Sequence, residues 1–155
     1  MLNPFRYPVL LISACAVLFF SDRLGKLISQ LNVNTNVIIN KCFAFGYYPN
    51  QGIGFGIQMN KTIIIVTSVI IILGLAGWLV HVWNKEYAMQ AWGISFIVAG
   101  ATNNLLDRIF FGHVIDYIKL FDWSLFNLAD VMIVVGLIIV LLGLHKPEKN
   151  DFTKN

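Results

Sequence analysis

Two aspartates, Asp116 and Asp130, stand among apolar residues, where an ionised carboxylate needs either a partner or a proton. Asp116 lies between Ile115 and Tyr117, and Asp130 precedes residues 131–144, which carry no charge. If folding brings the two carboxylates together, repulsion and desolvation leave one of them protonated near neutral pH. Such a pair can activate a water and protonate a leaving group. The two residues therefore predict general acid–base hydrolysis.

Two further carboxylates in the same part of the chain are weaker candidates for catalysis. Asp107 adjoins Arg108, which favours an ion pair or a structural hydrogen bond over catalysis. Asp122 adjoins Trp123 and is expected in a solvated turn. The ranking leaves the first pair of aspartates as the candidates for chemistry.

The two cysteines carry no chemistry in this interpretation. Cys15 lies in the first apolar run and Cys42 in the segment after it, so we expect no disulfide between them. Neither belongs to a metal-ligand spacing, and we predict no metal and no cofactor.

The composition is that of an integral membrane protein. Hydrophobic residues make up 57% of the chain and charged residues 12%, and the mean hydropathy is +0.72. Soluble domains carry about 25% charged residues. A net charge of +3, scattered among short loops, does not predict a nucleic-acid partner. The 155 residues can hold about four helices of membrane-spanning length, as one membrane-embedded domain over residues 1–155.

Four apolar stretches predict the transmembrane helices, and we place them at about residues 7–27, 62–83, 87–106 and 124–144. The third stretch carries small and polar residues, which favour close helix contact, so we expect it to be central and to face the fourth. The second stretch is almost entirely apolar and is expected to face lipid. The predicted fold class is an all-α membrane protein with four spans and a small sheet or extended region outside the membrane.

The distribution of Lys and Arg predicts the orientation. With four spans, the side that holds both termini carries five Lys or Arg, and the opposite side carries six. Arg23, Lys26 and Arg108 on the opposite side lie near aspartates at helix ends, where pairing reduces their weight. Discounting these three places both termini in the cytoplasm, and segments of about residues 31–61 and 107–123 on the other side.

The first of these outer segments is rich in glycine and aromatic residues. Phe43, Phe45 and Tyr47 alternate with other residues, and this period of two predicts short strands lying at the membrane surface. A glycine-rich loop capped by interfacial aromatics explains the same composition.

Five blocks of sequence span most of the chain: Asp22 with Lys26, residues 50–56, residues 104–108, residues 112–117 and residues 126–130. The last three strongly resemble successive signature blocks of the bacterial lipoprotein signal peptidase family, signal peptidase II, and the first two resemble its earlier blocks more weakly. All five follow in the family's order and at compatible spacing. The resemblance implies a four-helix inner-membrane aspartic peptidase that cleaves prolipoproteins just before a diacylglyceryl-modified cysteine. It implies these substrates and membrane lipid as partners, and an active site near the periplasmic face. Asp116 and Asp130 match the family's catalytic pair.

Supporting roles follow for several polar residues in the blocks. Asn104 and Arg108 lie four residues apart on one helix face and are expected to bind the substrate backbone or orient the site, rather than only to pair with Asp107. Asn127 is expected either to position Asp130 or the peptide, or to cap the last helix.

The earlier blocks contain residues with expected roles in structure or in substrate entry. Asp22 and Lys26 are expected to form a structural ion pair. Asn50 and Gly54 are expected to line the entry of the lipid-bearing substrate, although the requirements of a turn also explain Gly54.

Two positions depart from the family pattern, and they keep other functions open. Arg23 stands where the family has Gln, and Asn103 where it has Gly, so that Asn103 is expected to crowd a helix contact. His113 occupies a variable position and is expected at the surface. The alternatives are a divergent or non-catalytic lipoprotein-binding paralogue, and a small proton-coupled four-helix transporter. The presence of both aspartates and the clustering of ionisable residues towards one side favour the peptidase.

Overall fold

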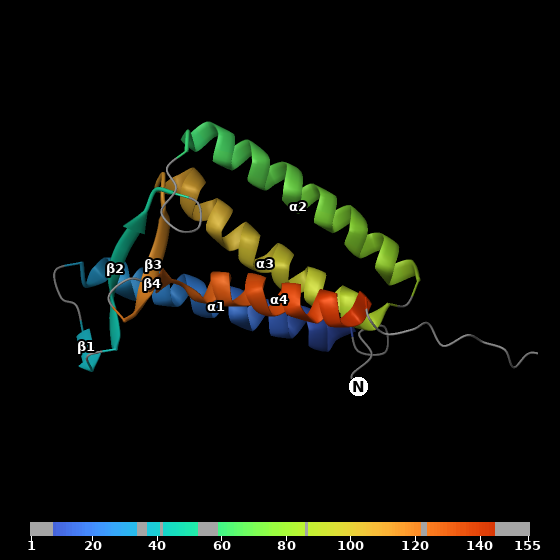
Figure 1. The fold of residues 1–155 in the computed structure, drawn as a ribbon, viewed down its shortest axis with the longest axis horizontal. Helices are drawn as coiled ribbons and strands as arrows, with labels where there is room; N and C mark the ends of the chain where they lie inside the picture. Colours follow the sequence, from blue (N-terminus) through green and yellow to red (C-terminus); the bar gives the residue numbers. More distant parts are fainter. Residues whose placement is uncertain are drawn as a thin grey trace, which may run out of the picture.

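The computed structural model describes residues 8–33, 37–40, 42–52, 59–85, 87–121 and 124–144. Four helices lie side by side, and a sheet lies across one end of them (Figure 1). The beginning of α1 and the end of α4 lie at the opposite end. The elements follow one another as α1 (Pro8–Leu31), β1 (Val37–Asn40), β2 (Phe43–Asn50), α2 (Lys61–Asn84), α3 (Ala88–Phe110), β3 (Val114–Leu120), β4 (Ser124–Phe126) and α4 (Leu128–Leu144).

The fold is mostly helical, with a small antiparallel sheet. Helices occupy most of the four predicted stretches, but their ends differ: α1 and α3 continue one turn further than expected, and residues 124–126 form strand β4 rather than the start of a helix. The small sheet predicted beside the helices is present, and both outer segments contribute strands to it.

Among the described residues, two helices are long and apolar enough to cross a membrane by themselves. Stretches of 18 residues within Pro8–Leu31 and Lys61–Trp83 reach mean hydropathies of 1.6 and 2.8, and Leu128–Leu144 is a shorter apolar helix. All three leave large apolar side chains exposed, such as Phe20, Leu73 and Leu142. Contiguous exposed apolar surface of this kind is expected against lipid and not against water.

Helix α3 packs directly against α4 through glycines. A Cβ atom added to Gly93 would lie 2.6 Å from the carbonyl oxygen of Gly136, and one added to Gly100 would lie 2.5 Å from that of Ala129. Small residues allow such close approach of two backbones within a membrane. The expectation that the third helix faces the fourth is confirmed.

A small apolar core lies at the end of the bundle away from the sheet. Val82 of α2, Ala91 and Ile94 of α3, and Val140 of α4 are all nearly inaccessible to solvent and pack together. This cluster joins the three later helices.

The sheet has the order β1-β2-β3-β4, and every neighbouring pair is antiparallel. In the central pair Asn50 lies opposite Val114 and Tyr48 opposite Asp116, with a register shift in β2 between Phe45 and Tyr48. Strand β2 confirms the strand predicted from the alternating aromatics. The pairing carries the end of β2 to the strand that holds Asp116.

Candidate active site

Asp116 projects from β3 and is almost completely buried, with 1% of its surface exposed. Its Oδ1 accepts a hydrogen bond from Nδ2 of Asn127 at 2.9 Å, and its Oδ2 accepts one from Nδ2 of Asn50, also at 2.9 Å. The Asn50 side chain is itself oriented, because its Oδ1 accepts the backbone N–H of Gly52 at 3.0 Å. Both carboxylate oxygens therefore face amide donors.

Asp130 lies in the first turn of α4 and forms a reciprocal pair with Asn127. Oδ1 of Asn127 accepts the backbone N–H of Asp130 at 2.9 Å, and Oδ2 of Asp130 accepts the backbone N–H of Asn127 at 3.2 Å. This arrangement is a capping box, in which the residue before the helix and the third helical residue satisfy each other's backbone. Asp130 Oδ1 also accepts Nδ2 of Asn104 at 2.8 Å. The helix start thus holds the carboxylate in place.

Asn127 connects the two aspartates. Its side chain bonds to Asp116, and its backbone bonds to Asp130, so both roles considered for it occur together. It is completely buried, and its amide also lies 3.3 Å from the carbonyl oxygen of Ile115. Folding has brought the two predicted carboxylates, fourteen positions apart in sequence, to opposite sides of one asparagine.

The environment of Asp116 favours its protonated form more than water does. Its pKa is raised from 3.8 to about 6, and burial is the largest cause. The hydrogen bond from Asn50 lowers the pKa, the charge of Asp130 raises it, and both the bond from Asn127 and the charge of Lys26 lower it. The repulsion from Asp130 means that the two carboxylates interact electrostatically, as an acid–base pair requires.

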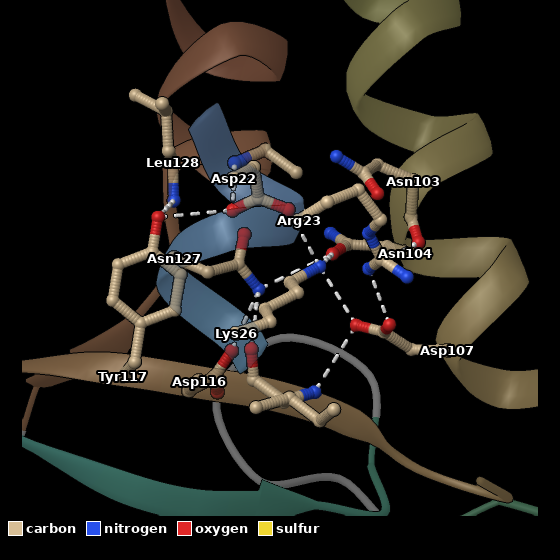
Figure 2. A network of polar contacts seen from close by, with 12 residues as sticks. Asp22, Arg23, Lys26, Asn103, Asn104, Asp107, Asp116, Tyr117, Asn127 and Leu128 are labelled. Atoms are coloured by element: carbon tan, nitrogen blue, oxygen red, sulfur yellow. Dashed lines mark hydrogen bonds and ion pairs between the residues drawn. The ribbon is translucent and has the colours of Figure 1, made fainter. Parts of the chain in front are cut away.

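A layer of buried charges lies close to Asp116 (Figure 2). Lys26 is 2% exposed, and its Nζ lies 2.8 Å from Oδ2 of Asp22, 2.7 Å from Oδ2 of Asp107 and 3.0 Å from Oδ1 of Asn104. The ion pair expected between Asp22 and Lys26 is therefore present. In a low-dielectric interior these contacts compensate charges that would be costly alone.

Asp107 has different partners from the expected one. The sequence suggested a pair with its neighbour Arg108, but its carboxylate pairs with Arg23 and Lys26 of α1 and accepts the backbone N–H of Ile115 at 3.2 Å. Its side chain points across to α1, as Figure 2 shows. Asp107 thus joins α1, α3 and β3, and its role in these contacts is structural.

Asn104 and Arg108 serve different parts of the site. Asn104 accepts the Lys26 ammonium through Oδ1 and donates to Asp130 through Nδ2, so it links the charged layer to the second aspartate. Arg108 donates from Nη2 to the carbonyl oxygen of Gly52 at 3.2 Å and holds the chain that follows β2. Gly54, predicted at the substrate entry, lies outside the described residues.

The two departures from the family pattern contact each other. Nδ2 of Asn103 donates to the carbonyl oxygen of Phe19 at 3.0 Å, and Nη2 of Arg23 donates to the carbonyl oxygen of Asn103 at 3.3 Å. Asn103 is completely buried. Rather than crowding the contact, this side chain hydrogen-bonds α3 to α1.

His113 is half-buried rather than fully at the surface. Its Nε2 lies 2.7 Å from the hydroxyl of Tyr47, and its ring packs near Phe111. Among the described residues, the hydrogen-bond and ring contacts of His113 are with Tyr47 and Phe111 and not with either aspartate.

One contributor to the site was missed from the sequence. Asp22 was expected only to pair with Lys26, yet its Oδ1 accepts the backbone N–H of Ala129 at 3.1 Å and the hydroxyl of Tyr117 at 3.1 Å. The signal for this contact in the sequence is Tyr117, a tyrosine directly after Asp116. Asp22 thereby anchors the first turn of α4.

A family model described as signal peptidase (SPase) II matches residues 14–146. This chain belongs to the signal peptidase II family. It is 34% identical over 137 residues to the lipoprotein signal peptidase of Clostridium novyi (strain NT), covering 83% of this chain and 92% of that protein. It is 33% identical over 146 residues to the lipoprotein signal peptidase of Solibacter usitatus (strain Ellin6076), covering 86% of this chain and 89% of that protein.

The fold is similarly shared with a solved structure. A bacterial membrane enzyme determined by the in meso method at 2.3 Å resolution superposes with a TM-score of 0.78 at 24% identity, over 96% of this chain and 95% of that one. The predicted resemblance to signal peptidase II is confirmed. The chain is a membrane peptidase of the family that removes signal peptides from prolipoproteins, and family membership favours this activity over a proton-coupled transporter.

Proposed function

We propose that the chain cleaves prolipoproteins on the N-terminal side of a diacylglyceryl-modified cysteine, with Asp116 and Asp130 as its catalytic pair. The observation that carries this assignment is the shared partner: Asn127 bonds to both carboxylates, one of them buried and the other half-buried at the start of α4. The other described aspartates, Asp22 and Asp107, are engaged with buried cations. They are therefore assigned to structure.

The two carboxylates divide the chemistry between base and acid. Both oxygens of Asp116 accept amide N–H groups, which favours its ionised form, and with a pKa of about 6 it is mostly ionised at pH 7. Asp116 takes a proton from water as the water oxygen attacks the scissile carbonyl carbon. Asp130 carries the other proton, donates a hydrogen bond to the carbonyl oxygen and then protonates the departing amine as the C–N bond breaks. The reaction needs no covalent intermediate.

Polar groups around the pair prepare it and receive the peptide. Asn127 and Asn104 hold Asp130, and Asn50 holds Asp116. We assign Arg108 to the substrate side, because its guanidinium reaches Gly52, two residues before Gly54 in sequence. Asn50 and Gly54 would line the entry of the lipid-bearing substrate.

The arrangement in the bilayer follows from where these groups lie. We propose that α1 to α4 all cross the inner membrane as one domain over residues 1–155, with both termini cytoplasmic. The aspartates lie at the sheet end of the bundle, away from the start of α1 and the end of α4, which supports an active site at the periplasmic face (Figure 1). Membrane lipid would cover the exposed apolar side chains.

Cleavage of a purified diacylglyceryl-modified prolipoprotein tests the assignment. Asp116→Asn and Asp130→Asn are each expected to lower kcat by about 10²–10⁴-fold, the usual contribution of a general acid or base. Asp151→Asn is the matched control, because this carboxylate lies beyond the residues that match the family and should leave turnover unchanged. Wild-type turnover in either dyad variant would contradict the pair.

The same assay with an unmodified prolipoprotein tests the substrate class. We expect the substrate that lacks the diacylglyceryl group to be cleaved far more slowly, because the lipid supplies binding energy at the membrane surface. Equal rates for the two substrates would refute the lipid requirement. A wild type that binds the modified substrate without cleaving it would refute catalysis altogether.

A further inference from the structure

Tyr117 directly follows Asp116 on β3, and its side chain reaches away from the strand to two other elements (Figure 2). It is buried, with 6% of its surface exposed. Its hydroxyl donates to Oδ1 of Asp22 on α1 at 3.1 Å and accepts the backbone N–H of Leu128 on α4 at 3.2 Å. One hydroxyl thus joins three elements.

The ring of Tyr117 is held as firmly as its hydroxyl. It packs against Phe45 of β2, with ring centroids 5.5 Å apart. The hydroxyl end of the ring also meets α1 at Gly25, where an added Cβ would lie 2.7 Å from the ring. These two contacts leave the hydroxyl little freedom to move from its hydrogen-bond partners.

The hydroxyl completes the hydrogen bonding of the first turn of α4. The free N–H groups of a helix start need acceptors outside the helix. Here Leu128 uses Tyr117, Ala129 uses Asp22, and Asp130 uses Asn127. Without the hydroxyl, the N–H of Leu128 would lose this acceptor, and Asp22 would hold α4 through Ala129 alone.

We propose that Tyr117 is a positioning residue, which fixes the start of α4, and with it Asp130, relative to the strand that carries Asp116. This inference rests on the proposed function of the two aspartates. Tyr117 directly follows Asp116 in sequence. Its hydroxyl accepts the backbone N–H of Leu128, which is two residues before Asp130. Because a displacement of about 1 Å can cost roughly 10²-fold in rate, a tether at this point bears directly on turnover.

The hydroxyl acts as a permanent donor. Burial and the neighbouring Asp22 carboxylate raise the pKa of Tyr117 well above its usual value of 10.0. The proton therefore stays on the phenol at every pH at which the peptidase can work. Tyr117 neither exchanges protons with the substrate nor replaces either aspartate.

Tyr117→Phe tests the inference, because it removes the hydroxyl and keeps the ring against Phe45 and Gly25. With the diacylglyceryl-modified prolipoprotein we expect kcat to fall about ten-fold while KM stays within about two-fold, as for an interaction that aligns the reacting groups. The melting temperature of the purified variant is measured in the same detergent.

Tyr47→Phe is the matched control. It removes a phenol hydroxyl from the neighbouring strand β2, where the partner is Nε2 of His113. We expect kcat to be unchanged in this variant, with a fall in melting temperature similar to that of Tyr117→Phe. If the two variants lose the same stability and the same fraction of kcat, the role of Tyr117 is structural only.

Asp22→Asn approaches the bridge from its other side and completes a double-mutant cycle. If Tyr117 acts through Asp22, then Tyr117→Phe should lower kcat less in the Asp22→Asn background than in wild type. Fully additive effects, or wild-type kcat in Tyr117→Phe, would overturn the inference. These outcomes differ from a failure of the catalytic pair. That failure would appear as wild-type turnover in the Asp116→Asn or Asp130→Asn variant, measured in the same assay.

Discussion

The two ends of the helix bundle differ in their contacts, because the buried ion pairs of the described residues all lie at the sheet end. Away from the sheet, α3 and α4 touch through the backbones of Gly93 and Gly136, beside an apolar core. At the sheet end, Lys26 and Asp107 are buried almost completely and are joined by an ion pair of 2.7 Å. Close apolar packing sets the distance between helices but specifies few polar positions. The charged layer is costly to bury, and it places hydrogen-bonding groups at defined points.

The difference explains why the chemistry lies at only one end. Asn104 belongs to the charged layer through Lys26 and also bonds to Asp130. The same helix, three turns earlier, presents Gly93 to α4. Helix α3 therefore combines a rigid packing surface with a polar one, and substitutions at the two ends should have separable consequences.

Removing the buried cation should have the largest effect on the charged end. Lys26→Met leaves the carboxylates of Asp22 and Asp107 without their shared partner, and loss of one member of a buried pair costs about 3–5 kcal/mol. We expect a lower melting temperature in detergent and little active protein. Lys61→Met, at the exposed start of α2, is the control and should melt like wild type. Equal melting temperatures for both variants would show that the charged layer contributes no stability.

Filling the helix contact should damage the apolar end by a smaller amount. In Gly93→Ala the new methyl meets the Gly136 carbonyl, which must shift, and overpacking of this kind costs about 1–3 kcal/mol. We expect a lower melting temperature with kcat of the folded enzyme retained. Gly77→Ala on α2 is the matched control, since nothing lies within 4 Å of its added Cβ. A Gly93→Ala variant as stable as Gly77→Ala would contradict the direct backbone contact.

The pH dependence of turnover should belong to the charged end alone. With the pKa of Asp116 at about 6, kcat/KM should fall roughly ten-fold between pH 7 and pH 5, as the base becomes protonated. The folded Gly93→Ala variant should show the same profile. A profile in which the rate falls above pH 6 would instead assign Asp116 as the acid of the pair.

The smallest expected effect is a gain in stability. Because the pKa of Asp116 is raised on folding, its contribution to the free energy of unfolding is most favourable below about pH 4 and is lost as the pH rises through 6. Well above pH 6, the ionised Asp116 carboxylate lowers the free energy of unfolding by about 3 kcal/mol relative to the protonated form. Asp116→Asn removes this cost, but its single side-chain oxygen can accept only one of the two amide hydrogen bonds. We therefore expect a net increase of about 1 kcal/mol in the free energy of unfolding at pH 8.

Melting curves at two pH values check this prediction. The melting temperature of Asp116→Asn should exceed that of wild type at pH 8, and the difference should shrink at pH 4, where the wild-type carboxyl is protonated. A variant that is less stable than wild type at pH 8 would mean that the ionised carboxylate stabilises the fold.

Local patterns in the sequence predicted the features that depend on nearby residues. Charge-free runs indicated the helices, glycines on the third helix indicated its contact with the fourth, and isolated acids indicated Asp116 and Asp130. Strand β3 was not foreseen, because Val114 to Tyr117 are buried consecutively and lack the alternation of a half-exposed strand. Strand β4 has only three residues and depends on its pairing with β3.

The missed contacts join residues that are far apart in sequence. Asp107 was paired with its neighbour Arg108, whereas its partner Arg23 lies 84 positions away. Asn103 was expected to crowd a helix, but the acceptor of its amide is a carbonyl on α1, again 84 positions distant. Spacing along one helix identifies which side chains share a face, but it does not identify what the face meets. That information depends on the packing of α1.

The capping box at the start of α4 makes Asp130 part of the helix frame as well as part of the proposed chemistry. Each time this carboxyl gains or gives up a proton, its strength as an acceptor for the N–H of Asn127 changes too. A replacement that cannot accept this bond would loosen the helix and remove the acid together. Asparagine retains a side-chain oxygen, so Asp130→Asn reports on proton transfer with the least disturbance to the end of the helix.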